Sequence, residues 1–287
     1  MEFPDRSDVD GLIDPQPLPA FARVRYAPSS ETLDDPVGTA RAELDRLDVG
    51  DLESGATVAI GVGSRGIHRI DDITAAAVAW ADDHGLEPVI VPAMGSHGGA
   101  TPEGQREVLA SLGITADAVG APIDARMSAE RLATVTVGET DVPVYVSEAA
   151  LEADAVAVIN RVKAHTNFTG PVESGLAKMA VVGLGKQRGA KSFHSTAIAE
   201  GYVETLTAAL EVIESSVPLL GGIALVENFD EELAHVEAVP AGSFLDREPE
   251  LLERAYAEMA TLPVDDIDLL VVDEIGKEIS GAGMDTN

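Results

Sequence analysis

Four segments of the chain combine glycine with side chains that can transfer a proton, bind an anion or hold a metal ion. Each segment follows an apolar run that predicts a buried strand. Ligands collect at the carboxyl ends of the strands in parallel sheets, so we expect these four loops to meet at one site. They cover residues Gly63–Arg69, Ala93–Thr101, Arg161–Gly170 and Asp273–Gly283.

Four of the six histidines fall in or near these loops, namely His97, His165, His194 and, as a weaker candidate, His68. His97 stands between glycines in the run Gly95–Thr101, GSHGGAT. Glycine lets the backbone approach a ligand closely, and the helix start that follows favours an anion, so His97 is a candidate general base or metal ligand. With His165 and His194 it could form a three-histidine zinc site, although no pair has the i, i+4 spacing of zinc ligands on one helix.

The run Gly61–Gly66, GVGSRG, has the G-x-G-x-x-G spacing of a dinucleotide-binding loop and follows a predicted strand. Such a fold also needs an acid at the end of the next strand to hold the ribose. Here the next strand ends in Pro92 and Ala93, which argues against a nicotinamide site. The loop is better interpreted as presenting Arg65, whose planar guanidinium suits a carboxylate. A plain surface salt bridge of Arg65 is the alternative.

Residues 160–195 form a basic segment in a chain whose formal net charge is −31. The segment holds four of the five lysines and a single acid, Glu173. We interpret it as a site where lysines and backbone amides hold an anion such as a phosphate. The run Gly183–Lys186 resembles part of a nucleotide-binding phosphate loop, but Gln187 follows the lysine where that motif has Ser or Thr, so an NTPase is excluded.

The composition of the 287 residues excludes several classes of protein. The chain has no cysteine, which rules out disulfides, iron–sulfur clusters and thiolate metal sites. Its 50 acids are spread along the chain, as in proteins that stay soluble at high salt, and the sign of the charge argues against nucleic acid as a partner. No apolar run reaches the roughly 20 residues of a membrane helix, so no membrane association and a cytoplasmic location are expected.

Buried strands and amphipathic helices are expected to alternate along the chain. This order predicts an α/β fold with a mainly parallel sheet, helices on both faces (Rossmann-like) and a short β-hairpin insertion at Leu132–Val146. Residues 1–272 are predicted to form this catalytic domain, and residues 273–287 the start of a connection to a second lobe. The expected strands are Phe21–Tyr26, Thr57–Val62, Pro88–Pro92, Asp154–Asn160, Gly222–Glu227 and Ile267–Val272, and the expected helices include Pro36–Leu47, Asp71–His84, a helix from Thr101 to Gly113, Tyr202–Ser215 and Glu250–Met259.

Three motifs together resemble the lactate racemase family, whose members use a nickel-pincer nucleotide. The first is Gly95–Thr101 followed by a helix. The second is His165, then Gly175–Lys178, then His194, and the third is Asp273–Lys277 after an apolar run. The resemblance extends from about Thr57 to the end of the chain. It implies a racemase or epimerase of a 2-hydroxy acid, and the charged pair Asp273-Glu274 favours a substrate other than lactate.

The resemblance also implies which residues hold the cofactor. Lys178 would be the covalent tether of the nickel-pincer nucleotide, with Lys186 as the alternative, and His194 would be the nickel ligand. The backbone at Gly98 and Gly99 would lie against the cofactor. Separate cofactor-synthesis enzymes would be needed as partners, so protein made without them would be empty.

For the substrate, the resemblance implies two histidines that face the reacting carbon from opposite sides. These would be His97 and His165, which would alternate as acid and base. Arg65 and Lys277 would hold the substrate carboxylate. The sequence leaves two alternatives open, a zinc-dependent hydrolase using the three histidines and a non-catalytic anion-binding module, and it does not predict the oligomeric state.

Overall fold

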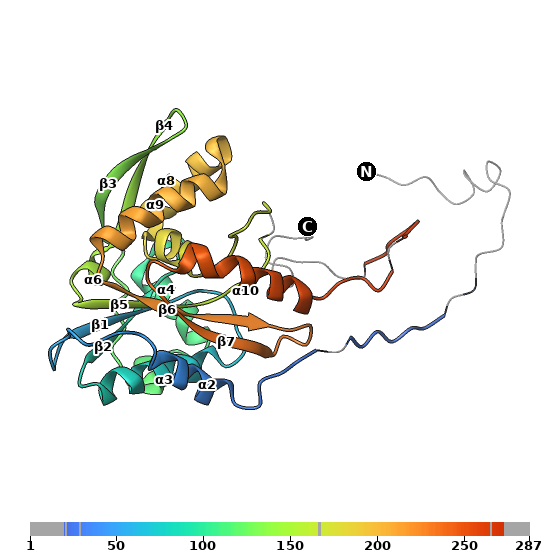
Figure 1. Ribbon diagram of the computed structural model, residues 1–287, viewed down its shortest axis with the longest axis horizontal. Coiled ribbons are helices and arrows are strands. Elements are labelled where there is room, and N and C mark those ends of the chain that lie inside the picture. Colours follow the sequence, from blue (N-terminus) through green and yellow to red (C-terminus); the bar gives the residue numbers. More distant parts are fainter. Residues whose placement is uncertain (1–19, 21, 29, 166–167, 265, 273–287) are drawn as a thin grey trace.

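The centre of the molecule is a five-stranded sheet with the strand order β2-β1-β5-β6-β7 (Figure 1). The computed structural model describes residues 20–272 except 21, 29, 166, 167 and 265. Strands β2, β1, β5 and β6 are parallel, and β7 is antiparallel to β6. The predicted mainly parallel α/β sheet is therefore confirmed. The strands are β1 (Thr57–Val62), β2 (Glu87–Pro92), β5 (Ala155–Arg161), β6 (Leu219–Glu227) and β7 (Leu233–Pro240).

Helices cover both faces of this sheet, as predicted. Figure 1 shows α2 (Pro36–Leu44) and α3 (Ile70–Asp83) below the sheet, with α9 (Tyr202–Ser216) and α10 (Phe244–Glu258) above it. Alternate residues of each strand belong to two separate cores: Ile60 packs on the side of α3, and the neighbouring Ala59 packs on the other side. A sheet that is buried on both faces explains why its strands read as continuous apolar runs.

The remaining helices lie near the carboxyl ends of the parallel strands or connect the strands. The helix α4 begins as its sequence predicts: the Thr101 hydroxyl accepts a hydrogen bond from Gly104 N at 3.1 Å, and Pro102 is the first helical residue. The other elements are the short turn η1 (Gly98–Ala100), α4 (Pro102–Ser111), α5 (Ala116–Val119), α6 (Glu148–Leu151), α7 (Leu176–Lys178), the π-helical turn η2 (Met179–Gly183) and α8 (Lys186–Glu200).

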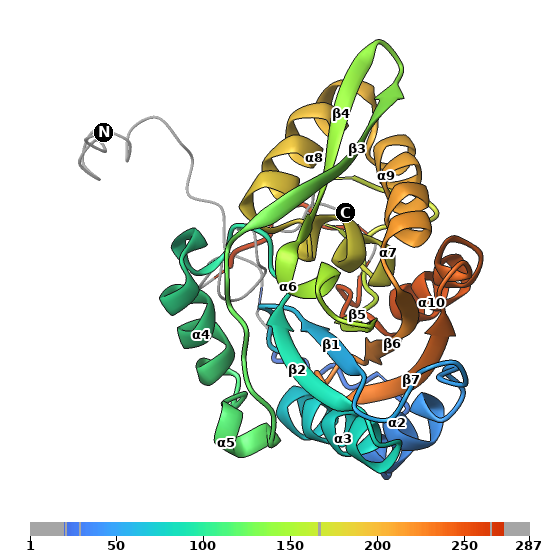
Figure 2. The same ribbon diagram turned by 90° about the vertical axis from the view of Figure 1, so that its left-hand side faces the viewer.

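The predicted hairpin insertion is present. It consists of β3 (Ala129–Val137) and β4 (Thr140–Ser147), joined by two residues that begin with Gly138 at φ 58°. A glycine suits the positive φ of such a tight turn. Figure 2 shows the hairpin projecting beyond the central sheet, and its strands pack against α8 and α9.

Two predicted strands are wrong. The described residues of 21–26 have no regular structure, and Val24 is 77% exposed. Residues 267–272 form no strand either, and Leu269 and Val271 are 80% and 76% exposed. A strand forms where a neighbour can bond its backbone groups, and an apolar run alone does not supply that neighbour. The predicted connection at 273–287 lies outside the described residues.

The last strand of the sheet is β7, which the sequence analysis did not predict. Its signal is weak: Val236 and Ala238 are buried while His235 and Glu237 between them are half-buried, an alternation over only a few residues. The helix α10 also begins six residues earlier than predicted, at Phe244. In the part of the chain that the structure describes, no helix is both long and apolar enough to cross a membrane.

Candidate active site

The loops that follow β1 and β2 meet at a contact between Ser64 and His97. The Ser64 hydroxyl and Nδ1 of His97 are joined by a short hydrogen bond. The backbone of the same turn is fixed to η2, because Gly95 N donates to Gly183 O at 3.1 Å. The His97 side chain is exposed. His97 thus stands on a turn that is tied to both neighbouring segments, at the carboxyl edge of the parallel sheet.

The two glycines after His97 serve different purposes. Gly98 and Gly99 both have positive φ, 65° and 64°. A Cβ at Gly98 would lie 2.5 Å from the carbonyl carbon of Gly104, whereas a Cβ at Gly99 would meet nothing within 4 Å. Gly98 is therefore required by its packing against α4. Gly99 leaves open space beside the backbone, where a ligand could approach.

Lys178 ends α7 and carries a partly buried amine. Burial, followed by the charges of Arg65 and Lys163, lowers the pKa of Lys178 to about 8, and the charge of Glu173 opposes that shift. Among the described residues the amine donates no hydrogen bond and forms no ion pair. Roughly a tenth of this amine is consequently uncharged and nucleophilic at pH 7.

The position of α7 is fixed by a buried carboxylate, that of Glu248, and a half-buried amide, that of Asn160. Glu248 of α10 is 1% exposed and accepts a hydrogen bond from Ala177 N at 2.7 Å. Burial raises the pKa of Glu248 to about 7. On the other side, Asn160 Nδ2 donates to Gly175 O at 2.8 Å. A Cβ at Gly175 would lie 2.6 Å from the Glu248 carboxylate, so this turn requires glycine.

Glu173, the lone acid of the basic segment, organises the loop of His165. The carboxylate is 1% exposed and accepts hydrogen bonds from His165 N at 2.5 Å, Gly170 N at 3.1 Å and the Tyr256 hydroxyl at 3.0 Å. It ties the loop to α10, which carries Tyr256. This role of Glu173 is not among the predictions from the sequence, although its isolation among cations is a signal that points to it.

An aromatic cluster connects His165 to His194. The His165 ring lies 4.4 Å from the Phe168 ring, which stacks on Tyr202 at 4.3 Å between centroids. Tyr202 meets Phe193 edge-on at 5.7 Å, and Phe193 meets His194 at 5.6 Å. These contacts orient the His165 imidazole and place α8 beside its loop.

His194 lies on the exposed side of α8, and the charge of Lys178 acts on its pKa. Partial withdrawal from water, followed by the Lys178 charge, lowers the pKa of His194. The imidazole is therefore neutral at neutral pH, the state in which histidine binds a metal. The predicted tether and the predicted nickel ligand are thus electrostatic neighbours in the structure.

A half-buried ion pair lies within electrostatic reach of Arg65. Arg161, the last residue of β5, pairs with Glu227, the last residue of β6. Glu227 also accepts a hydrogen bond from His68 N at 2.6 Å. Burial lowers the pKa of Arg161, and the Arg65 charge acts in the same direction. Arg65 itself is exposed and lies within electrostatic reach of both Arg161 and Lys178.

Lys186, the alternative tether, has a different environment from Lys178. It is fully buried, and its ammonium donates to Pro92 O at 2.8 Å and to Gln105 Oε1 at 3.3 Å. Burial lowers the pKa of Lys186 to about 8, opposed by the charge of Asp124. Its donors are engaged with the end of β2 and with α4.

The zinc alternative is not supported by the geometry. His97, His165 and His194 are all described, and no three histidine, aspartate or glutamate side chains of the described residues are grouped so that they could hold a metal ion. His97 contacts Ser64, whereas His165 and His194 lie at the two ends of the aromatic cluster. The predicted residue Lys277 lies outside the described residues.

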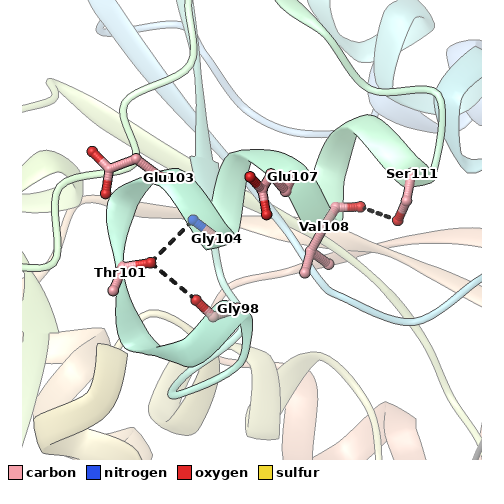
Figure 3. A pocket seen from close by; sticks show the side chains of 7 residues that line it. All are labelled: Gly98, Thr101, Glu103, Gly104, Glu107, Val108 and Ser111. Atoms are coloured by element: carbon pink, nitrogen blue, oxygen red, sulfur yellow. Dashed lines mark hydrogen bonds between the residues drawn. The ribbon is translucent and has the colours of Figure 1, made fainter.

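A surface depression of about 530 Å³ runs along α4 (Figure 3). Its two charged side chains, Glu103 and Glu107, are acidic. The Thr101 hydroxyl accepts from Gly104 N and donates to Gly98 O, and the Ser111 hydroxyl donates to Val108 O, so both hydroxyls are bonded within their own helix and turn. An acidic hollow does not suit the anion that the basic segment predicts. It is lined by Gly98, Thr101, Glu103, Gly104, Glu107, Val108 and Ser111.

Comparisons with known proteins add a similarity of fold. No protein-family model matches the chain, and no curated protein matches it in sequence. Among solved structures, the chain is similar to the apoprotein of the lactate racemase from Thermoanaerobacterium thermosaccharolyticum, with 13% sequence identity and a TM-score of 0.49. The aligned part covers 77% of this chain and 55% of the racemase chain. A similarity of this level carries no information about activity.

Proposed function

We propose that this chain carries the catalytic site of a racemase or epimerase of a 2-hydroxy acid, with a nickel-pincer nucleotide tethered to Lys178. The observation that carries the proposal is the electrostatic proximity of Lys178 and His194, since the Lys178 charge lowers the pKa of His194. The lysine is partly buried, has no hydrogen bond among the described residues and has its pKa lowered to about 8. The histidine beside it has a lowered pKa and is neutral. One group can form a covalent bond and the other can bind a metal.

The residues around this pair fit such a cofactor. Arg65 and Lys163 lie close enough to Lys178 to lower its pKa, and they supply the positive charge that a phosphate requires. Lys178 would attach the cofactor covalently and His194 would bind its nickel. When bound, the cofactor supplies the acceptor and donor of the substrate's Cα hydride. We assign the tether to Lys178 because the amine of Lys186 is already hydrogen-bonded inside the protein.

His97 and His165 would carry the protons. As the Cα hydride leaves, one imidazole takes the proton of the substrate hydroxyl, and the product is a 2-keto acid. When the hydride returns to the opposite face, the other imidazole gives a proton to the forming hydroxyl. Ser64 fixes the His97 ring, while Glu173 fixes the backbone of His165. Imidazole exchanges protons at neutral pH, as this symmetry of roles requires.

The substrate carboxylate would bind near Arg65. Arg65 is exposed and lies within electrostatic reach of Lys178, so its charge is available to an anion near the tether. A guanidinium binds a carboxylate through two parallel hydrogen bonds, which would orient Cα between the two histidines. Lys277 is proposed as a second carboxylate ligand on the resemblance alone.

A racemisation assay with cofactor-loaded protein tests this function. The protein is co-expressed with cofactor-synthesis enzymes and given single enantiomers of a panel of 2-hydroxy acids in D₂O. We expect one substrate to racemise and to keep hydrogen at Cα, because the hydride is returned rather than exchanged with water. Loaded protein that racemises nothing in the panel contradicts the proposal and leaves an anion-binding module.

Matched variants connect the activity to the two histidines. His97→Asn and His165→Asn should each lower kcat by about 10²- to 10⁴-fold, the usual contribution of general acid–base catalysis. His84→Asn is the control, since His84 is an exposed residue at the end of α3. Equal activity of all three variants would contradict the assigned roles.

A further inference from the structure

The environment of Lys186 is unfavourable for a lysine, both for its side chain and for its backbone. Its side chain is 0% exposed, and its backbone has a φ of 52°, a left-handed conformation that is strained for any residue with a side chain. A methionine would fill a similar volume without burying a charge. No carboxylate of the described residues forms an ion pair with the ammonium. The position therefore calls for a donor of hydrogen bonds, and its two acceptors are Pro92 O and Gln105 Oε1.

Gln105 connects the Lys186 ammonium to the turn that carries His97. The Gln105 side chain is also 0% exposed. Its oxygen accepts from Lys186, and its nitrogen donates to Gly95 O at 3.1 Å and to His97 O at 3.4 Å. An ammonium can only donate and a carbonyl can only accept, so flipping this amide would place donor against donor and acceptor against acceptor. The ammonium thereby fixes which end of the amide faces the turn.

The turn thus has a fixed position on which His97 depends. Gln105 binds the carbonyls at the two ends of this turn, Gly95 O and His97 O. In addition, Gly95 N donates to Gly183 O at 3.1 Å. The ring itself meets Ser64. Loss of the amide's orientation would free both carbonyls and allow the turn, and with it the Ser64–His97 contact, to shift.

We infer that Lys186 is a positioning residue, which acts through Gln105 to hold the turn from Gly95 to His97 and so places the His97 imidazole for proton transfer. This role replaces that of a second candidate tether. It rests on the proposed function in so far as His97 is an acid and base. Its geometric part concerns the apoprotein alone.

The geometric part is tested by NMR of the apoprotein with nitrogen-15 in its histidines. In Lys186→Met the stem is kept and the ammonium is lost, so we expect the His97 Nδ1 and Nε2 shifts to move toward those of a freely averaging imidazole. The control is Lys191→Met, which removes an exposed lysine from the same helix and should leave the His97 signals unchanged. Unchanged His97 signals in folded Lys186→Met would overturn the inference.

A second variant covers the case in which Lys186→Met fails to fold. Gln105→Glu keeps a partner for the ammonium, as an ion pair, and turns a carboxylate toward Gly95 O and His97 O. The His97 signals should move in this variant as well, and their constancy in folded protein would equally overturn the inference.

A kinetic readout separates positioning from general support of the fold. In loaded enzyme, Lys186→Met should slow formation of the 2-keto acid from one enantiomer by about 10- to 100-fold, since a misplacement near 1 Å has that effect, and leave the other enantiomer within about twofold. Equal losses for both enantiomers would show a merely structural role and overturn the inference. If the wild type has no activity while the His97 signals still respond, the proposed function fails and the positioning of the turn stands.

Discussion

The two buried lysines of the basic segment, eight residues apart, show how differently the same side chain can be used. Burial lowers the pKa of both Lys178 and Lys186 to about 8. Lys186 is fully buried, and its hydrogen bonds join the end of β2 to α4. Lys178 is partly open and stands among other cations beside His194. Burial of an amine therefore does not indicate its role, whereas the partners of the amine do.

The largest expected difference between the two lysines is in chemical reactivity. With acetic anhydride at pH 8, Lys178 should be acetylated on the order of 100-fold faster than Lys186, because the buried amine reacts only when the structure opens locally. Peptide mass spectrometry measures both rates, with the exposed Lys191 as an internal reference. Equal rates for the two buried lysines would remove the distinction.

The hydrogen bonds of Lys186 should contribute more to the stability of the fold than Lys178 does. At about pH 10, where both amines are largely uncharged in the folded protein, Lys186→Met should lower the free energy of unfolding by about 1–3 kcal/mol, because two buried acceptors, Pro92 O and Gln105 Oε1, lose their donor. Lys178→Met should lower it by no more than about 0.5 kcal/mol at that pH, since no hydrogen bond of the described residues is lost, and should raise it near pH 7, where the wild type carries a desolvated charge. Urea denaturation measures both. A larger loss in Lys178→Met would contradict the assigned roles.

The pH dependence of stability should reflect both lysines. Because their pKa values fall from 10.5 to about 8 on folding, the unfolded chain binds more protons between these values, and stability rises with pH across that window. Each lysine adds a slope of at most about 1.4 kcal/mol per pH unit. Thermal unfolding from pH 8 to 10 should show the rise, and Lys178→Met should reduce it. A slope that Lys178→Met leaves unchanged would mean that Lys178 titrates normally.

The smallest expected change is the pKa shift of each lysine when the acid near it is neutralised. Glu173 raises the pKa of Lys178, and Asp124 raises that of Lys186. Glu173→Gln should therefore lower the pKa of Lys178 further and leave Lys186 unaffected, and Asp124→Asn should do the reverse. The pH dependence of acetylation at each lysine reports both values. A shift of both lysines in either variant would show that the two regions are coupled.

Much of the fold could be predicted from local sequence. The apolar runs of β1, β2, β5 and β6 identify strands buried on both faces, and Thr101-Pro102 marks the start of α4. The segment 267–272 has a similar apolar pattern and forms no strand. What distinguishes it is the lack of a neighbouring strand, which is a property of the tertiary structure.

The candidate site, like the fold, could be predicted from the sequence only in part. Histidines and lysines beside glycines could be recognised from the sequence as candidates for chemistry. The residues that position them could not, because their roles come from contacts between distant segments. Gln105 meets Lys186 81 residues further on, and Glu173 meets Tyr256 83 residues further on. The hydrogen bonds of the Lys186 amine, which the sequence does not show, support Lys178 rather than Lys186 as the tether.

Intact mass and nickel content, measured after co-expression with cofactor-synthesis enzymes, test whether Lys178 is the tether of a nickel cofactor. We expect one covalent adduct on Lys178 and about one nickel per chain, both retained in Lys186→Met and both lost in Lys178→Met. An adduct on Lys186, or an unmodified Lys178 in protein made with those enzymes, would contradict it.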